Sequence, residues 1–232
     1  MRHRYQLVRL TRLSRRLRTT VLGCGISLAL LASLGAGALA AGTPNVVPAS
    51  GKVAGHGYGY WLKRSWQATF STTSPAKSCR TLTSDGHRVG YLTLRTLATG
   101  TAHYTCSEPA GRPMYVVGLS NECSTFKGDH DKFGTSDQQL KRCAKALFKG
   151  ARDTTSIDGH PVNVGRLVTA SSAFAVEVPR RSPYGFTAGA GRSAAYGFGL
   201  LLTGFAPGTH QIHTRWAIGA AKWNITFTVH VR

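Results

Sequence analysis

One acidic segment has the residue types of a calcium-binding loop. Counting from Asp129, carboxylates stand at positions 1, 3 and 9, which are Asp129, Asp131 and Asp137, and a glycine stands at position 6. Phe133 and Leu140 occupy positions 5 and 12, where a calcium loop needs oxygen ligands. We therefore favour a polar loop whose Asp137 lies at the positive end of a following helix, with calcium as the alternative. No other cofactor is predicted.

A glycine-rich segment combines aromatic and basic residues. Exposed rings there would stack on the faces of sugars, and neighbouring guanidinium groups would hold acidic substituents. The alternative is a loop that covers one end of the domain with its own rings, and this is the interpretation we favour. The candidate ligand-binding residues are Tyr184, Phe186, Arg180, Arg181 and Arg192, with Tyr196 and Phe198 nearby.

Catalytic candidates are few. Glu122 and Glu177 are the carboxylates set close to apolar strand runs, and they fit either an acid/base pair or, as we favour, buried hydrogen-bond acceptors. The residues around Ser193 approximate a nucleophile elbow, but a strand rather than a helix is expected to follow. His210 and His213 are three residues apart on an expected strand and so face opposite ways, which indicates rim histidines rather than joint metal ligands. We assign no catalytic residue.

The N-terminus has the features of an export signal. Seven arginines and no acid precede an apolar or small-residue stretch over 21–39, and Ala38-Leu39-Ala40 has the small-x-small pattern that precedes cleavage. A membrane anchor is the alternative, but glycines dilute the apolar segment. We predict a signal peptide over 1–40 with cleavage after Ala40, which leaves a secreted or extracytoplasmic chain without a membrane span.

The charge balance predicts anionic partners. The chain has 29 Lys and Arg against 9 Asp and Glu. Seven arginines leave with the signal, so 22 basic residues remain against 9 acidic ones, a formal charge of +13. A charge of this sign attracts anionic cell-wall polymer, acidic polysaccharide or anionic lipid, and we expect no specific nucleic acid. The favoured alternative is that the charge serves solubility alone, because the basic residues are scattered along the chain.

Cysteine usage agrees with export. Removal of Cys24 with the signal leaves four cysteines, an even number that predicts two disulfides in an oxidising compartment. No C-x-x-C pair is present, which argues against a zinc ribbon or a thioredoxin-like site. Of the three possible pairings we choose the local one, Cys79 with Cys106 and Cys123 with Cys143.

The periodicity of apolar residues changes along the chain. Residues 41–56 are rich in Pro, Gly, Ser and Ala and predict a flexible linker. Helical spacing predicts helices over 58–70 and again near 137–150, where Ser136 and Gln139 form a capping box. Period-two alternation or short apolar runs predict strands over 89–97, 102–106, 114–119, 154–157, 160–164, 174–178 and 224–231. Residues 57–232 should therefore form one antiparallel β-sandwich, jelly-roll or Ig-like, with one or two flanking helices.

Five short patterns are distributed along the chain: the Gly-x-Gly-Tyr-x-Tyr-Trp segment leading to Trp61 and Trp66, Asn121-Glu122-Cys123-Ser124, Lys141-Arg142-Cys143-Ala144, Ile157-Asp158-Gly159-x-Pro161-Val162, and Pro207-Gly208-Thr209-His210-x-Ile212. Together they resemble a family of exported proteins of actinobacteria and related bacteria that has no established activity. The resemblance implies a single exported domain and assigns no catalytic residue.

Together these features predict a non-catalytic, cell-envelope-associated β-sandwich protein that binds an anionic envelope polymer or a polysaccharide. The alternative is a secreted hydrolase that acts on a wall or extracellular polymer. Carboxylates or histidines gathered in one cavity would favour the hydrolase, whereas a flat basic face would favour binding.

Overall fold

The computed structural model describes residues 42–74, 77–126 and 133–232, which belong to one compact unit. The predicted signal peptide lies outside the described residues. The helices are α1 (Tyr58–Phe70), α2 (Asp137–Leu147) and the short 3-10 helix η2 (Val164–Leu167). The strands are β1 (Asn45–Val46), β2 (Cys79–Ser84), β3 (His87–Leu92), β4 (Gly100–Glu108), β5 (Met114–Ser124), β6 (Arg152–Ile157), β7 (His160–Val162), β8 (Thr169–Ala170), β9 (Phe174–Val178), β10 (Gly189–Thr203), β11 (Gly208–Ile218) and β12 (Ala221–Val231).

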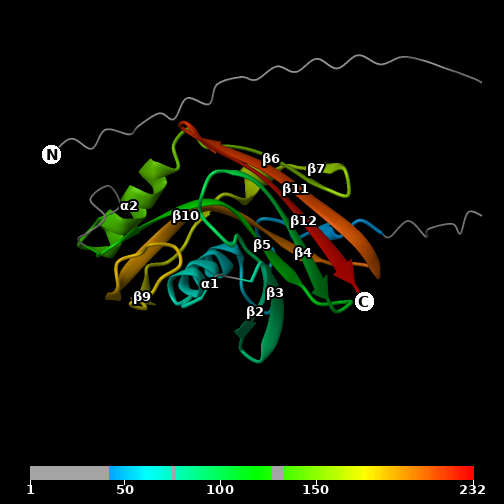
Figure 1. Cartoon of the computed structure of the whole chain (residues 1–232), viewed down its shortest axis with the longest axis horizontal. Coiled ribbons are helices and arrows are strands. Elements are labelled where there is room, and N and C mark those ends of the chain that lie inside the picture. Colours follow the sequence, from blue (N-terminus) through cyan, green and yellow to red (C-terminus); the bar gives the residue numbers. More distant parts are fainter. Residues whose placement is uncertain (1–41, 75–76, 127–132) are drawn as a thin grey trace, which may run out of the picture. The chain divides into compact units, whose positions relative to one another are not determined.

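The large sheet has seven strands and is built around the long strand β10 (Figure 1). β10 pairs antiparallel with β5, and also with β1, β8 and β9 at other points along its length. β5 extends the sheet to β3, which runs parallel to it, and β3 pairs with β2. The contact between β3 and β5 covers only Gly90–Leu92 against Met114–Val116. Beyond Val116, β5 therefore continues without β3 beside it.

Close contact between β5 and β10 requires glycines. The register shifts between Gly197, which faces Ser120, and Gly199, which faces Val117, so β5 carries one extra residue there. A Cβ on Gly197 would lie 2.4 Å from the Leu119 carbonyl oxygen, and one on Gly199 would lie 2.3 Å from the Tyr115 hydroxyl. Only a residue without a side chain allows the two strands to approach this closely.

The small sheet has five strands in the order β4-β12-β11-β6-β7. β12 runs parallel to β4, and the other pairs are antiparallel. The alternation predicted for the C-terminal strand is confirmed, because Ile225, Phe227, Val229 and Val231 are buried while the residues between them are partly exposed. Figure 1 shows β4, β11 and β12 running side by side.

The two sheets face each other, and the helices flank the large sheet. Gly90 of β3 lies against Glu108 of β4, so this face of the large sheet meets the small sheet. The next residue, Tyr91, turns to the opposite face and donates to the Ser65 carbonyl of α1 at 3.3 Å. The predicted mainly β sandwich with flanking helices is therefore confirmed, with one parallel pair of strands in each sheet beside the antiparallel ones.

Both predicted helices are present. α1 buries Trp61, Leu62 and Phe70. α2 begins with the predicted capping box, in which the Ser136 side chain accepts from the Gln139 backbone N–H and the Gln139 side chain accepts from the Ser136 backbone. Among the described residues, no helix is both long enough and apolar enough to cross a membrane.

Two expectations need correction. Residues 42–56 do not form the predicted flexible linker, because Asn45 and Val46 pair with β10 and the side chains of Val47 and Val53 are buried. Composition misled here, since Pro48 and Gly51 belong to a tight turn in which the Gly51 N–H is bonded to the Pro48 carbonyl at 2.7 Å. The strand expected over 89–97 ends at Leu92, where β3 leaves β5.

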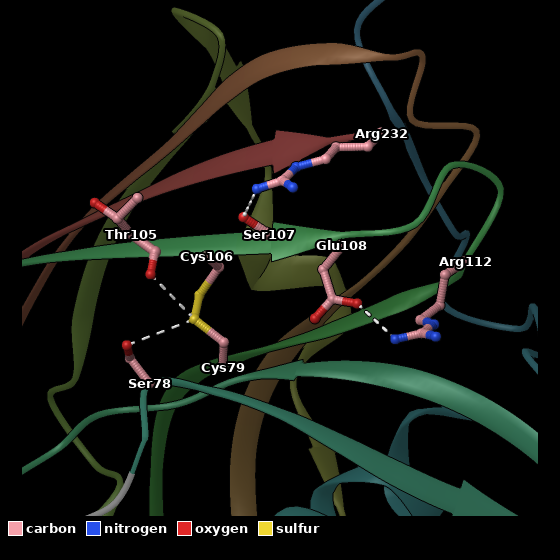
Figure 2. Close-up of a disulfide and its surroundings, with 8 residues drawn as sticks. All are labelled: Ser78, Cys79, Thr105, Cys106, Ser107, Glu108, Arg112 and Arg232. Atoms are coloured by element: carbon pink, nitrogen blue, oxygen red, sulfur yellow. Dashed lines mark hydrogen bonds and ion pairs between the residues drawn. A yellow bond between two sulfur atoms is a disulfide. The ribbon is translucent and has the colours of Figure 1, made fainter.

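The predicted disulfides are both present. Cys79–Cys106 joins β2 of the large sheet to β4 of the small sheet (Figure 2), and Cys123–Cys143 joins β5 to α2. Figure 2 also shows Glu108 beside the first disulfide, with a hydrogen bond of 3.0 Å from Arg112. Burial raises the pKa of Glu108, and the Arg112 hydrogen bond opposes part of that rise. Two disulfides are typical of an oxidising, extracellular environment.

We expect the inter-sheet disulfide to contribute strongly to stability. Replacing Cys79 and Cys106 by Ser removes a loop closure of 27 residues, which should lower the free energy of unfolding by about 3.5 kcal/mol in the chain-entropy model. Urea denaturation of the double variant against the parent measures this difference. Equal midpoints would show that the packing of the two sheets holds them together without the cross-link.

Gly197 provides a test of the close contact between the strands. Gly197→Ala places a Cβ against the Leu119 carbonyl at a backbone φ of 150°, so we expect a loss of about 3 kcal/mol or failure to fold. Gly42→Ala is the control, because nothing lies within 4 Å of its added Cβ. Thermal denaturation distinguishes the two variants, and a Gly197→Ala protein as stable as the control would contradict the steric argument.

Candidate functional site

The outward face of the small sheet is polar and contains no acid among the described residues. Alternation along each strand places one set of side chains on the core and the other outside. The outward set is formed almost entirely by hydroxyl, amide, histidine and basic side chains, all exposed or partly exposed. Its members are Thr101, His103, Thr105 and Ser107 on β4, Lys222, Asn224, Thr226, Thr228 and His230 on β12, Thr209, Gln211, His213, Arg215 and Ala217 on β11, and Arg152, Thr154 and Ser156 on β6.

Three cations gather at one end of this face, and we call Arg152, Arg215 and Lys222 the basic cluster. Ala217 lies between Arg152 and Lys222 in register, and Arg215 is two residues away along β11. Strand spacing puts the backbone positions of Arg152 and Lys222 about 10 Å apart and that of Arg215 about 7 Å from Ala217. None of the three forms an ion pair or a side-chain hydrogen bond with a described residue, so all three remain available to a ligand.

A shallow cavity of about 480 Å³ adjoins the basic cluster. The three cations line it together with Asp153, Trp216 and Trp223. The two indole rings lie in register on the inward side of β11 and β12, with centroids 6.5 Å apart. The cavity is therefore lined by positive side chains from the outward face of the small sheet and by two flat apolar indole rings from its inward face.

Asp153 is the one acid in this lining, and its oxygens are already bonded. Thr155 donates to one carboxylate oxygen at 2.8 Å, and Thr214 donates to the other at 3.1 Å. Burial raises the pKa of Asp153 to about 6, although both threonine hydrogen bonds act in the opposite direction. No second carboxylate or histidine lines this cavity, so the described residues offer Asp153 no partner for acid/base catalysis.

The residues predicted to bind a ligand are not gathered in one exposed patch. Arg192 of β10 is held by Asp137, with contacts of 2.9 and 2.7 Å to its two carboxylate oxygens. Tyr184 is partly buried and donates to the Leu94 carbonyl at 2.9 Å, and Phe186 packs on Phe70 with ring centroids 4.6 Å apart. Two guanidinium groups, those of Arg180 and Arg181, stay exposed.

Of the three candidate calcium ligands, Asp129 and Asp131 lie outside the described residues. The third, Asp137, stands in the first turn of α2 as predicted, and its carboxylate is occupied by Arg192. Among the described residues, no group of three His, Cys, Asp or Glu side chains could hold a metal ion. Calcium binding therefore stays an untested alternative.

The catalytic candidates are separated. Glu122 is buried on β5 and accepts from the Ser193 hydroxyl at 2.8 Å, whereas Glu177 is exposed on β9. Their partners on β10 are Ala195 and Ala190, five residues apart, so the two carboxylates do not form a pair. Ser193 lies in a strand and is fully buried, in a setting unlike a nucleophile elbow.

The two histidines occupy opposite faces, as predicted, but His210 is not at the rim. It is fully buried, with Nδ1 at 2.8 Å from Asp158 and Nε2 at 3.0 Å from the Ala206 carbonyl. Asp158 also accepts from the Gln211 backbone at 2.7 Å. The contact fastens the β6–β7 turn to β11, which is a structural role.

Sequence reasoning missed the basic cluster. Arg152, Arg215 and Lys222 are far apart in the chain, and only the register of three strands brings them together. The available signal was the run of polar outward positions in the two C-terminal strands. This pattern predicts a solvated face, but it does not predict which residues of other strands lie beside it.

Asp153 should make stability depend on pH. Its pKa is about 6 in the folded protein against 3.8 in the unfolded chain, so the folded state binds the proton more tightly. Stability from this group is complete below pH 3.8 and is lost as pH rises through 6. When the pH falls from about 7 to about 4, the free energy of unfolding of the parent should therefore rise by on the order of 1 kcal/mol relative to that of Asp153→Asn. This value is reduced for the partial exposure of the carboxyl group. Urea denaturation at both pH values tests this, and identical pH dependence in both proteins would contradict it.

No family model and no curated protein matches the chain. Two solved structures show a distant likeness. The solution structure of amebosin is 12% identical, and the match covers 57% of this chain and 96% of that chain with a TM-score of 0.22. The structure of PbICP-C in complex with falcipain-2 is 11% identical, and the match covers 62% of this chain and 98% of that chain with a TM-score of 0.26. These TM-scores are too low to support an argument about fold or function.

Proposed function

We propose that the protein is an exported, non-catalytic module that binds an anionic polymer of the cell envelope. The observation that carries this proposal is the basic cluster on the outward face of the small sheet, where none of the described residues is acidic. A linear polyanion presents charges at regular spacing, and three unpaired cations whose backbone positions are about 8 to 10 Å apart match repeated charges without induced folding. The threonine, serine and asparagine side chains beside the cluster add hydrogen-bond donors and acceptors.

The compartment supports the same proposal. The two disulfides fit an oxidising location, and the basic and apolar N-terminal residues fit an export signal. Outside the cytoplasmic membrane, anionic wall polymers and acidic polysaccharides are the polyanions to which a basic protein is exposed. Association with them keeps an exported protein at the envelope without a membrane span.

The proposal predicts salt-sensitive retention on a polyanion. The mature chain should bind a heparin resin at low salt and elute by roughly 0.5 M salt, because screening removes the attraction. Changing Arg152, Arg215 and Lys222 together to Gln should lower the eluting salt concentration markedly. All three side chains are exposed, so the melting temperature should stay within a few degrees of the parent value.

A charge-matched control separates a site from net charge. Lys141, Arg142 and Lys149 lie on α2 or just after it, are exposed, and lose the same three charges when changed to Gln. Elution of this control close to the parent would support the basic cluster as the binding site. Equal effects of the two triple variants would show that net charge alone causes retention and would remove the basis of the proposal.

A further inference from the structure

A second cavity, of about 220 Å³, lies where β3 leaves β5. It is lined by residues of α1, by the part of β5 that pairs with β10 but not with β3, and by inward-facing residues at the end of β11 and the start of β12. A cavity of about 150 Å³ is enough to bind benzene, so this one has room for a single six-membered ring with its substituents. Its position is a consequence of the short contact between β3 and β5.

The lining of this cavity carries no charged side chain, although the chain is strongly basic. Aromatic rings form much of its walls, namely Trp66, Tyr91, Tyr184, Trp216 and Trp223. An uncharged ligand is therefore favoured, because an ion would lose its hydration without gaining a partner. Flat rings suit a ligand with a flat apolar face.

Polar groups in the lining have unused hydrogen-bonding capacity. Ser120 accepts from the Trp66 indole N–H at 3.1 Å and still has its hydroxyl hydrogen to donate. Asn121 donates to the Leu147 carbonyl at 3.2 Å, which leaves its side-chain oxygen as an acceptor. A ring that bears hydroxyl groups would use these donors and acceptors, whereas a hydrocarbon would leave them unpaired.

The two cavities adjoin each other. Trp216 and Trp223 line both the uncharged cavity and the one beside the basic cluster. We infer that the uncharged cavity binds one neutral sugar ring of the same polymer whose anionic group lies on the basic cluster. The ligand class is thus an acidic polysaccharide in which neutral and charged units are neighbours. This inference rests on the proposed function and adds the identity of the repeating unit.

Three oligosaccharides test the inference by titration calorimetry and tryptophan fluorescence. A hyaluronan hexasaccharide alternates neutral and anionic rings, chitohexaose is neutral throughout, and hexagalacturonate carries a charge on every ring. We expect the hyaluronan fragment to bind at least about tenfold more tightly than either of the others, and to change the fluorescence of the cavity tryptophans.

Two variants assign the neutral ring to the cavity. Trp66→Ala removes a wall of the uncharged cavity that does not line the cavity beside the basic cluster, so it should weaken hyaluronan binding about tenfold while leaving hexagalacturonate unchanged. Leu97→Trp should have the same effect by blocking the entrance, and it leaves the core intact because Leu97 is 41% exposed. Phe133→Ala, which removes an exposed ring elsewhere, is the control and should change neither affinity.

The outcomes separate this inference from the proposed function. If hyaluronan and hexagalacturonate bind equally and neither cavity variant matters, the inference is wrong, while retention on the polyanion resin still supports the proposed function. If none of the three oligosaccharides binds, the inference is also wrong, and the resin experiment alone then decides the proposed function. Tighter binding of hyaluronan that both cavity variants abolish supports it.

Discussion

The close contact between β5 and β10 at Gly197 and Gly199 determines which side chains of β5 face each neighbouring layer. The extra residue in β5 reverses which side chains face each layer. Tyr115 faces α1 before it, and after it Ser120 bonds Trp66 of α1 while Cys123 reaches α2 on the other face. The same strand continues past the point where β3 turns away, which creates the uncharged cavity. The irregularity between β5 and β10 thus positions both helices, and the departure of β3 from β5 opens the space between the sheets.

The outward face of the small sheet is basic because the acidic side chains of the described residues lie elsewhere, where most of them bond other side chains. The chain has nine acidic residues, seven of which are described, and six of these seven are bonded to another side chain. The bonded pairs are Asp85–His56, Glu108–Arg112, Glu122–Ser193, Asp137–Arg192, Asp153 with Thr155 and Thr214, and Asp158–His210. Because these contacts occupy the carboxylates, the exposed lysines and arginines meet little opposite charge on the outward face of the small sheet. Composition alone leaves open whether positive charge is dispersed, and the register of the strands shows where it gathers.

Local patterns in the sequence predict local structure well. Period-two alternation in the last strand, the Ser136 capping box and the short cysteine spacings are each determined by neighbouring residues, and each prediction is confirmed. The failures concern contacts between distant segments. The Pro- and Gly-rich residues 42–56 are held by β10, more than 140 residues away in the chain, which composition cannot show. The basic cluster likewise depends on three strands being in register, and the buried position of His210 depends on Asp158 in another hairpin.

Several of the motifs that resemble an exported family contain residues that connect one helix, strand or turn to another. Asn121 bonds the end of α2, Glu122 accepts from Ser193, and Cys123 is linked to α2. Asp158 of another motif holds His210 of a third. These residues act on the fold, because each satisfies a buried polar group or a cross-link that would be costly to leave unmade. Arg152, Arg215 and Lys222 lie outside all five motifs and contribute no described internal contact, so binding chemistry on this face can change without loss of the framework that supports it.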